Sequence, residues 1–490
     1  MRFYFLIKFE IIYIADDLPV SMLFVEPPFM SHEVESCQQT TRGWASLGLR
    51  PADFLQSSLT NALSYRWLIF AVLACGYVLV YFHRLCPAVV AVDMMSDLQT
   101  GGALLGLLGS AYFYPYALMQ IPAGLLADSW GARRTVTLFT LIAFLGALII
   151  GLAPNVIVAI VGRILVGLGV SMLFVPTMKI LTEWFRPDEF ARMTGILLAM
   201  GGLGSLVSAT PLALVTVWFG WRMAFVAVAG LTLLLALCVW MVVRDRPADM
   251  GWSIPGKAKV GAMDDISLAN GVKQVLASGN FWLLAGWFFF QSAVFFSFAG
   301  LWGGPYLNHV YSLDRVGAGQ ILSMLAVGLI VGSPMQTWFS NRVCKGRKPV
   351  LILSSVVTSG ITGLLVFSTA GLSLNTLSLI CFLMGMFTSA SVVIGFSATK
   401  ELFPVQIAGT SIGLINLFPF AGGAVFQPVL GWILQGHEVS ENVYSVSGYQ
   451  SAFVVLLCCG LTALCCAGIM RETMKDGHLV HGHYPLLAKD

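Results

Sequence analysis

The chain has 490 residues, of which 57% are hydrophobic and only 10% are charged, and its formal net charge is +3. Soluble domains carry about 25% charged residues, so this composition excludes an ordinary soluble protein and predicts a membrane protein with many spans. The small net charge says little about partners, and no basic patch in a plausible context indicates a nucleic-acid ligand.

The first residues of the chain do not have the pattern of a signal peptide. Lys8 and Glu10 interrupt the opening apolar stretch, the acidic pair Asp16–Asp17 follows it, and no small-residue cleavage pattern is present. We therefore expect residues 1–64 to be a mobile N-terminal tail. A mis-assigned start within this stretch is the alternative.

Hydrophobic runs predict twelve membrane-spanning helices, because a helix needs ~20 mostly apolar residues to cross a bilayer. Their rough limits are 66–94, 102–126, 134–153, 156–183, 193–216, 222–243, 281–304, 316–339, 349–371, 375–399, 408–434 and 450–470. The polar, turn-rich residues 244–280 separate the first six from the last six, which indicates an internal repeat. We expect a six-helix bundle at 65–243, a linker at 244–280, a second bundle at 281–470 and a tail at 471–490.

Positive side chains gather on one side of the predicted membrane. They are Arg133, Arg134, Arg186, Arg192, Arg244, Arg246, Lys257, Lys259, Lys273, Arg342, Lys345, Arg347, Lys348, Lys400, Arg471 and Lys475. The opposite loops offer little beyond Arg222 and Arg315. By the positive-inside rule, both termini and the linker are expected in the cytoplasm.

The first span carries two ionisable residues, His83 and Arg84. An arginine in hydrocarbon costs about 3 kcal/mol on insertion scales, so Arg84 must face protein or water. Tyr77, Tyr81 and Arg84 share one helical face, which we interpret as a site for a small anion. An arginine that snorkels to the headgroups, or pairs with a carbonyl group, is the alternative. His83 is either a titrating group or a neutral histidine bonded to a carbonyl group.

A turn motif stands between the second and third spans. It consists of Gly124, Asp128, Gly131, Arg133 and Arg134 within the stretch GLLADSWGARR. Glycine permits the tight turn, and the acid and the arginines can pair across neighbouring helix ends. The motif resembles the signature loop of the major facilitator superfamily, G-x3-D-[RK]-x-G-[RK]-[RK], except that a serine stands at its first basic position.

The matching loop of the second half, SNRVCKGRKP at residues 340–349, echoes this motif with Arg342 and Arg347. Asn341 replaces the expected acid, so we expect a weaker charge network there. The resemblance covers about residues 66–471 and leans toward bacterial sugar-phosphate and organic-anion permeases. It implies an all-α integral membrane protein with twelve transmembrane helices in two pseudo-symmetric six-helix bundles.

The same resemblance suggests roles for single residues. The stretch RILVGLG in the fourth span is similar to the family motif R-x3-G-x-G, whose arginine, here Arg163, lies near the central cavity. In the organophosphate branch, an arginine spaced like Arg84 faces the substrate phosphate, and a second arginine on the seventh span assists it. That partner is missing here. Trp287 and Gln291 lie on an otherwise aromatic stripe instead, which favours a smaller or less charged anion.

Further cavity candidates come from helical spacing. Tyr112, Tyr116 and Gln120 share a face of the second span, and Asn416 and Gln427 share a face of the eleventh. Aromatic stripes usually pack in cores, whereas a lipid-facing amide is costly and more often lines a cavity.

These observations predict a secondary transporter of a small organic anion that works by rocking one bundle against the other. Arg84 supplies the attraction, and Asp128, Arg133 and Arg134 hold the cytoplasmic gate in the outward-open state. We expect a small-molecule substrate, a coupling proton or counter-anion, a lipid bilayer and function as a monomer. No cofactor, metal or catalytic residue is expected.

Three alternatives remain open at this point. A transporter of a neutral or amphipathic solute, of the drug-efflux type, would make Arg84 structural. A non-transporting ligand sensor of the same fold would bind without flux. A membrane enzyme or flippase would need a cluster of polar groups at headgroup level, and the sequence shows no such cluster.

Overall fold

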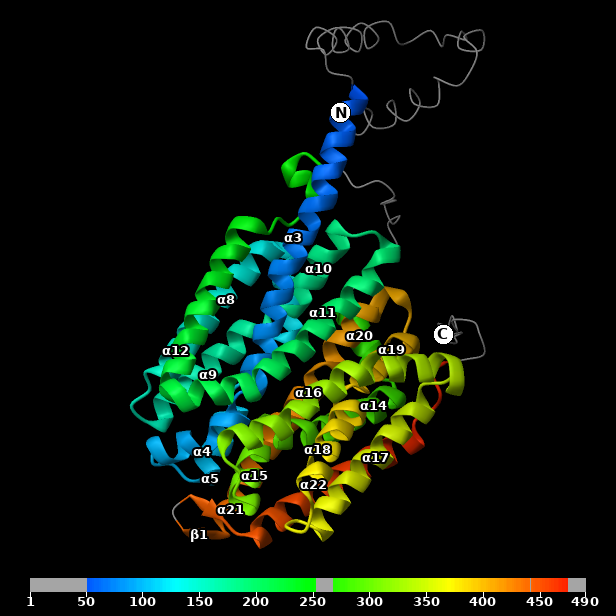
Figure 1. Ribbon diagram of the computed structural model, residues 1–490. Helices are drawn as coiled ribbons and strands as arrows, with labels where there is room; N and C mark the ends of the chain where they lie inside the picture. The colour runs from blue at the N-terminus through cyan, green and yellow to red at the C-terminus, as the bar shows by residue number, and fades with distance from the viewer. Residues whose placement is uncertain (1–50, 253–267, 441, 475–490) are drawn as a thin grey trace, which may run out of the picture. The chain divides into compact units, whose positions relative to one another are not determined.

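The computed structural model describes residues 51–252, 268–440 and 442–474 (Figure 1). Residues 1–61 and 62–490 form two separate compact units, and only residues 51–61 of the first are described. Everything below concerns the second unit. The expected N-terminal tail up to residue 50, part of the linker and the tail after residue 474 lie outside the described residues.

The first half is entirely helical within the described residues. Its elements are α3 (Pro51–Leu85), α4 (Pro87–Asp97), α5 (Gly102–Ser110), α6 (Phe113–Leu118), α7 (Gln120–Trp130), α8 (Ala132–Gly151), α9 (Val156–Ser171), α10 (Phe174–Trp184), α11 (Pro187–Val207) and α12 (Thr210–Val242). A short 3-10 turn, η2 (Pro247–Met250), follows in the linker.

The second half repeats this pattern and adds π-helical turns. Its elements are α13 (Leu268–Leu276), α14 (Gly279–Ser297), η3 (Phe298–Trp302), α15 (Gly303–Tyr311), α16 (Arg315–Trp338), η4 (Phe339–Cys344), α17 (Lys348–Phe367), α18 (Leu374–Leu383), η5 (Met384–Ser389), α19 (Val392–Leu402), η6 (Val405–Ile407), α20 (Ala408–Ile415), α21 (Leu417–Gln435), β1 (Glu438–Ser440), β2 (Val443–Tyr444) and α22 (Val446–Ile469). The strands β1 and β2 form one antiparallel hairpin.

Ten continuous helical stretches among the described residues are long and apolar enough to cross a membrane. The difference from twelve has two local causes. The second span is divided into α5, α6 and α7, none of which is long enough by itself. The fifth and sixth spans run together as residues 192–242, although Gly220, at φ 77° and ψ 161°, breaks the helix between them. Twelve spans are therefore present.

Helices within each half approach closely where glycines face each other. In the first half α8 packs against α9 and α12, and a Cβ atom added to Gly146 would lie 2.7 Å from the carbonyl oxygen of Gly162. In the second half α14 packs against α21 and α22, and α17 packs against α22. Close backbone approach of this kind replaces the hydrophobic driving force that is absent between helices in lipid.

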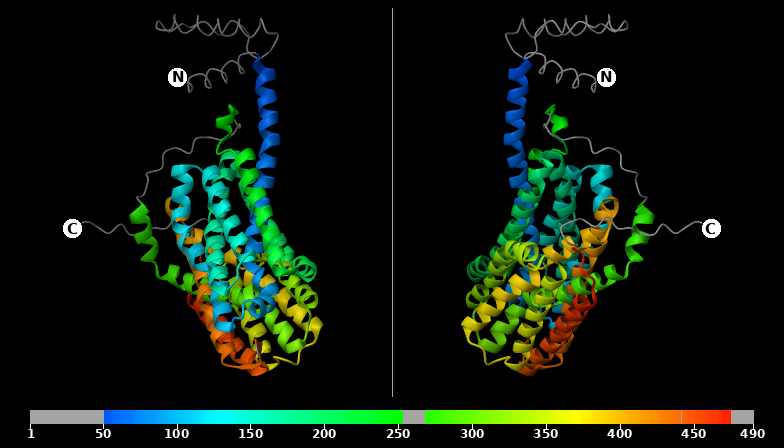
Figure 2. Two further views of the ribbon diagram at one scale, coloured as in Figure 1. Left: turned by 90° about the vertical axis from the view of Figure 1, so that its left-hand side faces the viewer. Right: turned by 90° about the vertical axis from the view of Figure 1, so that its right-hand side faces the viewer.

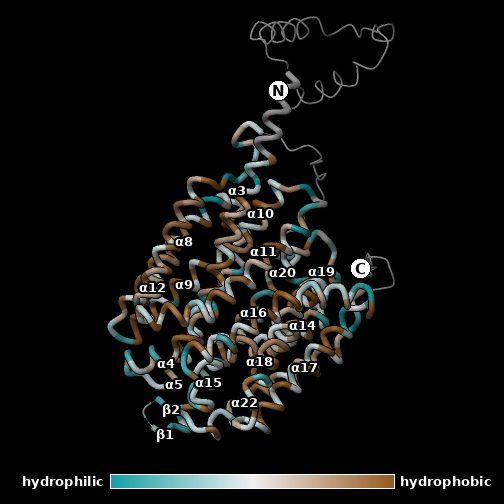
Figure 3. Tube along the Cα trace, in the orientation of Figure 1, coloured by the Kyte–Doolittle hydropathy of each residue, from teal (hydrophilic) through white to brown (hydrophobic). Residues whose placement is uncertain are grey.

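The surface is apolar where a soluble protein would be polar. Large side chains such as Trp218, Phe367 and Trp432 are 71%, 83% and 74% exposed. Hydrophobic colours run along the helices, whereas hydrophilic colours gather mainly at loops and helix ends (Figure 3). This distribution is expected when the surrounding solvent is lipid.

The two halves meet along α4, α5, α11, α12 and α21, and the views in Figure 2 show blue to green helices against yellow to red ones. Helix α5 packs against α21, α11 and α12 pack against α16, and α4 packs against α15. An ion pair between Asp93 and Arg315 also joins the halves. The site described next lies between these contacts.

An ion pair between a carboxylate outside the membrane-spanning stretches and the start of the first span makes a pH-dependent contribution. Glu189, at the start of α11, accepts hydrogen bonds from Arg66 and from the backbone N–H of Arg186. Partial burial raises the pKa of the Glu189 carboxyl, but these hydrogen bonds outweigh it, and the net pKa lies below its ordinary value.

The Glu189→Gln variant should therefore have a weaker pH dependence of stability than the wild type. The carboxylate stabilises the fold fully above its unfolded-state pKa of about 4.3, and the stabilisation is lost as the pH falls through the lower folded-state pKa. The side chain is 29% exposed, so we expect a difference of at most about 1 kcal/mol. Unfolding midpoints of both proteins between neutral and acidic pH measure it; parallel curves would contradict the prediction.

Candidate functional site

Arg84 lies where the two halves meet, surrounded by aromatic rings. Its guanidinium carbon is 4.6 Å from the ring centre of Tyr81 and 5.2 Å from that of Tyr116, both in the first half. It is 4.9 Å from Phe420 and 5.7 Å from Phe296, both in the second half. Arg84 is only 5% exposed, and among the described side chains it forms no salt bridge.

The chain places Arg84 at the last turn of α3 because a proline stops that helix. Pro87 has no backbone N–H, so the carbonyl group of His83, four residues earlier, lacks its helical donor. Arg163 in α9 replaces that donor, with its Nη1 atom 2.7 Å from the His83 oxygen. The arginine of the fourth span thus supports the backbone next to Arg84.

This support can be tested by a double-mutant cycle on Arg163 and Pro87. Arg163→Met should destabilise the fold by about 1–2 kcal/mol less in a Pro87→Ala background than in the wild type, because alanine restores an N–H for the His83 carbonyl group. Thermal unfolding of the four proteins in detergent measures the coupling. Equal costs in both backgrounds would show that the hydrogen bond is unimportant.

Stacked tyrosines connect the two arginines. The rings of Tyr112 and Tyr116 stack with their centres 5.5 Å apart, and the guanidinium of Arg163 lies 5.0 Å from the Tyr112 ring. Several buried polar atoms here have no partner among the described residues. They are Nε of Arg84, Nε and Nη2 of Arg163, both ring nitrogens of His83 and the hydroxyl of Tyr112. Buried donors of this kind are uncommon in folded proteins and indicate a functional role or a bound polar group.

Two further candidates, Tyr77 and Tyr81, pack against α11. Their ring centres are 5.4 Å apart, and a Cβ atom added to Gly201 would lie 2.7 Å from the Tyr81 ring. Glycine is therefore required at position 201 if both tyrosines keep this position. Of the rings around Arg84, that of Tyr81 comes from the same span as Arg84 itself.

The amides of the second and eleventh spans meet across the two halves. The Nδ2 atom of Asn416 donates to Oε1 of Gln120 at 2.7 Å, and Nε2 of Gln120 donates to the carbonyl oxygen of Tyr116 at 3.0 Å. Nearer α4 and α5, Nε2 of Gln427 donates to the carbonyl oxygen of Phe296 at 2.8 Å. These amides thus lie on both sides of Arg84 along α21.

The structure places Trp287 and Gln291 away from this site. The indole N–H of Trp287 donates to Ser355, and Nε2 of Gln291 donates to Thr358, so both side chains point toward α17. The face of α14 that contacts Arg84 carries Phe296 instead, which the sequence analysis did not select. The sequence could not single out Phe296, because six phenylalanines lie within residues 288–298 and they are spread over every face of this helix.

The contacts described for the turn between α7 and α8 are with the linker and the end of α12. Gly131 has φ +91°, and a carboxyl oxygen of Asp245 accepts from the backbone N–H of Arg133 at 2.7 Å. The Arg133 guanidinium also donates to the carbonyl oxygen of Trp240. Arg134 is exposed, and the side chain of Asp128 lies outside the described side chains. A cavity of about 390 Å³ lies beside this turn.

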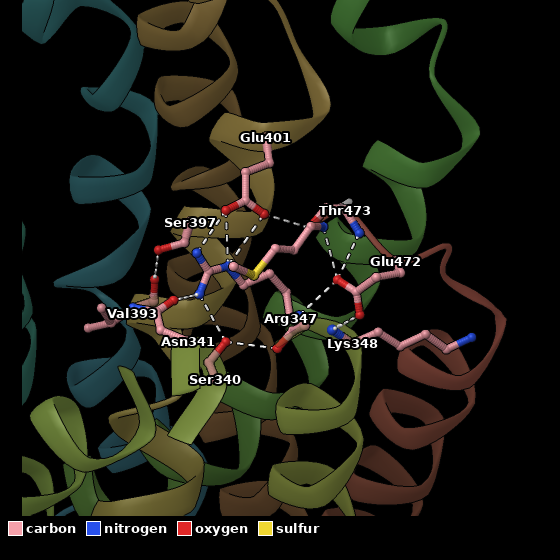
Figure 4. A network of polar contacts seen from close by, with 11 residues as sticks. Ser340, Asn341, Arg347, Lys348, Val393, Ser397, Glu401, Glu472 and Thr473 are labelled. Atoms are coloured by element: carbon pink, nitrogen blue, oxygen red, sulfur yellow. Dashed lines mark hydrogen bonds and ion pairs between the residues drawn. The ribbon is translucent and has the colours of Figure 1, made fainter. Parts of the chain in front are cut away.

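A network of polar contacts surrounds Arg347 in the second-half loop (Figure 4). Arg347 donates to Oδ1 of Asn341 at 2.6 Å and to Glu401 of α19 at 2.8 Å. Glu472 accepts from the backbone N–H of Arg347 at 2.8 Å. Carboxylates from distant segments thus contact Arg347 although position 341 carries no acid; the relative strength of the two loop networks stays a prediction. Arg342 is exposed.

Comparison with known proteins fits this architecture. Residues 73–427, more than half of the chain, match the Major Facilitator Superfamily. The chain belongs to this family. It is a transport protein that spans the membrane many times, not an enzyme, and the expected major facilitator fold is confirmed.

Several relatives and solved structures are similar to this chain at low identity. It is 24% identical to the uncharacterized transporter YybO of Bacillus subtilis (strain 168), over 80% of this chain and 92% of that protein. The hexuronate transporter of the same strain is 21% identical over 77% of this chain and 90% of its own. Among solved structures, a bacterial homolog of the human lysosomal transporter Spinster, inward-facing and unoccupied, has a TM-score of 0.65 at 19% identity, covering 83% of this chain and 98% of that one.

Proposed function

We propose that this member of the superfamily is a secondary transporter of a small organic anion, with Arg84 as the main contact of the anionic group. The observation that carries the proposal is a buried arginine without a described acidic partner, between rings from both halves. A buried charge is costly unless it is paired, and an intramembrane cation of this kind normally has a functional partner. The hexuronate transporter among the relatives acts on an anion as well.

In this proposal the site opens to each side in turn as the halves rock. The rings of Tyr81 and Tyr116 on one half and Phe296 and Phe420 on the other half surround the same guanidinium, so an anion bound there contacts both halves. Arg163 and the Tyr112 hydroxyl supply further donors. His83 and Tyr77 support these groups from α3, and Gln120, Asn416 and Gln427 support them from the seam between α5–α7 and α21.

The proposed topology places both termini and the linker in the cytoplasm of a bacterial inner membrane, with the α7–α8 turn on the same side. Asp128, Gly131, Arg133 and Arg134 would then act on the cytoplasmic gate, together with the Arg347 network of the second half. The protein would work as a monomer, and either a proton or a counter-anion would be coupled to the substrate. Uptake driven by an imposed pH gradient separates these two.

The experiment that tests the proposal combines binding and flux. Purified protein is screened for thermal stabilisation by small anions, neutral sugars and amphipathic compounds, and hits are tested for uptake into proteoliposomes. A ligand at about 100 times its dissociation constant stabilises the folded state by about 2.7 kcal/mol. Binding without uptake would favour the ligand sensor.

A transporter of amphipathic solutes is the second candidate, and one observation favours it. Phe113, Phe296 and Phe420 form an aromatic cluster next to Arg84, with ring centres 5.0 to 6.4 Å apart. Stabilisation by neutral amphipathic compounds alone, equal in the wild type and in an Arg84 variant, would support this function.

A further inference from the structure

Two helices of opposite halves are interrupted in the same way. Helix α6 ends at Leu118 and α7 begins at Gln120, with Pro122 in its first turn. Helix α20 ends at Ile415 and α21 begins at Leu417, with Pro419 in its first turn. A proline has no N–H for the carbonyl group four residues earlier, so each interruption lacks one helical hydrogen bond and bends more easily.

On one side of these interruptions, α5 of the second span and α21 of the eleventh are in direct backbone contact. A Cβ atom added to Gly431 of α21 would lie 2.3 Å from the carbonyl oxygen of Gly102, and one added to Gly106 would lie 2.7 Å from that of Gln427. The hydroxyl of Tyr114 also donates to the carbonyl oxygen of Ala424 at 2.9 Å. Backbone contact of this kind holds the two helices close together on this side of the interruptions.

On the other side, along α7 and α20, two glycine positions have free space beside them. Gly124 lies one turn beyond Gln120 on the same face of α7, and Gly413 lies one turn before Asn416 on the same face of α20. A Cβ atom added to either glycine would meet no atom within 4 Å. The backbone-to-backbone packing between the halves therefore does not continue at these two positions, although α7 and α20 still lie side by side.

The last contacts before the open segment are one ring pair and one amide pair. The ring centres of Tyr116 and Phe420 are 4.2 Å apart, and both rings contact Arg84. One turn further, the amide of Asn416 donates to that of Gln120 at 2.7 Å. Gln120 is 4% exposed and Asn416 is half-buried, so this hydrogen bond is partly shielded from water.

We propose that the Gln120–Asn416 hydrogen bond is a tie that holds a cytoplasmic gate closed beneath Arg84. When the tie breaks, α7 and α20 bend apart at Pro122 and Pro419, while α5 and α21 stay packed. The opening then reaches the Tyr116–Phe420 pair and, through it, the Arg84 site. This inference rests on the proposed transport function and on the proposed topology.

The tie is tested with single cysteines as probes of opening. In a background without native cysteines, Gly124→Cys or Gly413→Cys is exposed to a charged maleimide in inside-out vesicles. Both positions have room for the added side chain. Gln120→Leu and Asn416→Leu should each raise the labelling rate by roughly two- to ten-fold, the factor that a typical hydrogen bond contributes to an equilibrium. The double variant should label no faster than the faster single variant.

Two matched controls accompany these variants. Gln450→Leu removes an amide that donates to the Val366 carbonyl oxygen within the second half, and it should leave the labelling rate unchanged. Pro122→Ala and Pro419→Ala restore an N–H at each interruption, and they should lower the rate by stiffening the helices. The proline variants also keep the proposal testable if a leucine variant fails to fold.

The outcomes separate this inference from the function on which it rests. Unchanged rates in both leucine variants, or singles whose effects multiply in the double variant, would overturn the tie while leaving anion binding intact. Labelling of Gly124→Cys from right-side-out vesicles alone would overturn the cytoplasmic location of the gate. Loss of anion binding at Arg84 with the expected labelling pattern would overturn the transport function only.

Discussion

Arg84→Gln should strongly reduce both the stabilisation of this protein by its anionic substrate and the uptake of that substrate. Hydrogen bonds to a charged group contribute about 1.5–3 kcal/mol, and each 1.36 kcal/mol changes affinity tenfold, so we expect binding to weaken by about 10- to 100-fold or more. The unliganded variant should still fold, because Arg84 has no described salt bridge to lose. Thermal shift with a titrated anion, followed by proteoliposome uptake, measures both effects.

Arg84→Lys is the matched control for charge. Lysine keeps the positive charge but loses the planar guanidinium that forms two parallel hydrogen bonds and stacks on aromatic rings. It should bind the anion more weakly than the wild type and more tightly than the glutamine variant. An Arg84→Gln protein that binds and transports the anion like the wild type would refute the proposed site.

Gly304→Ala should block transport. The two halves could then no longer close where α4 meets α15. A Cβ atom at Gly304, in α15, would lie 1.7 Å from the carbonyl oxygen of Ala88 in α4. The oxygen belongs to the backbone and the Cβ atom is fixed rigidly to it, so neither can move away as the end of a flexible side chain would. Because the contact joins the two halves, the substitution blocks one conformation of the pair rather than the folding of either half. We expect folded protein that still binds the anion but shows no uptake.

Gly328→Ala is the matched control for a clash inside one half. Its Cβ atom would lie 2.0 Å from the carbonyl oxygen of Phe382, and both residues belong to the second half. This variant should lose stability and yield of folded protein. Normal uptake by Gly304→Ala, or equal loss of folded protein in both variants, would contradict the assignment of the α4–α15 contact to closure.

The helix count shows what hydrophobic runs report well and what they miss. All twelve runs correspond to helical segments, because lipid requires every backbone group to be paired within the segment. The hydrophobic runs do not show that the second span is divided at Met119 and the eleventh at Asn416. A proline is common in the first turn of a helix, so Pro122 and Pro419 do not by themselves mark a break within a run.

The seventh span shows why helical faces are harder to assign than helices. The sequence analysis selected Gln291 from its place on an aromatic stripe, but a buried amide needs a polar neighbour wherever it lies. That neighbour is Thr358, within the same half, so the amide marks an internal contact and the cavity face carries Phe296. A sequence alone cannot tell which polar neighbour a buried amide has.

By itself, the sequence determined the membrane class, the helical content, the two-half organisation and the presence of Arg84 in a span, because each follows from hydropathy, spacing and the cost of a charge in lipid. Only the tertiary structure decided what surrounds Arg84, which carbonyl group Arg163 supports, and where Gln120 meets Asn416. These contacts join residues far apart in the chain, such as Arg84 with Phe420 and Gln120 with Asn416. Their physical basis is packing between helices, which local patterns do not encode.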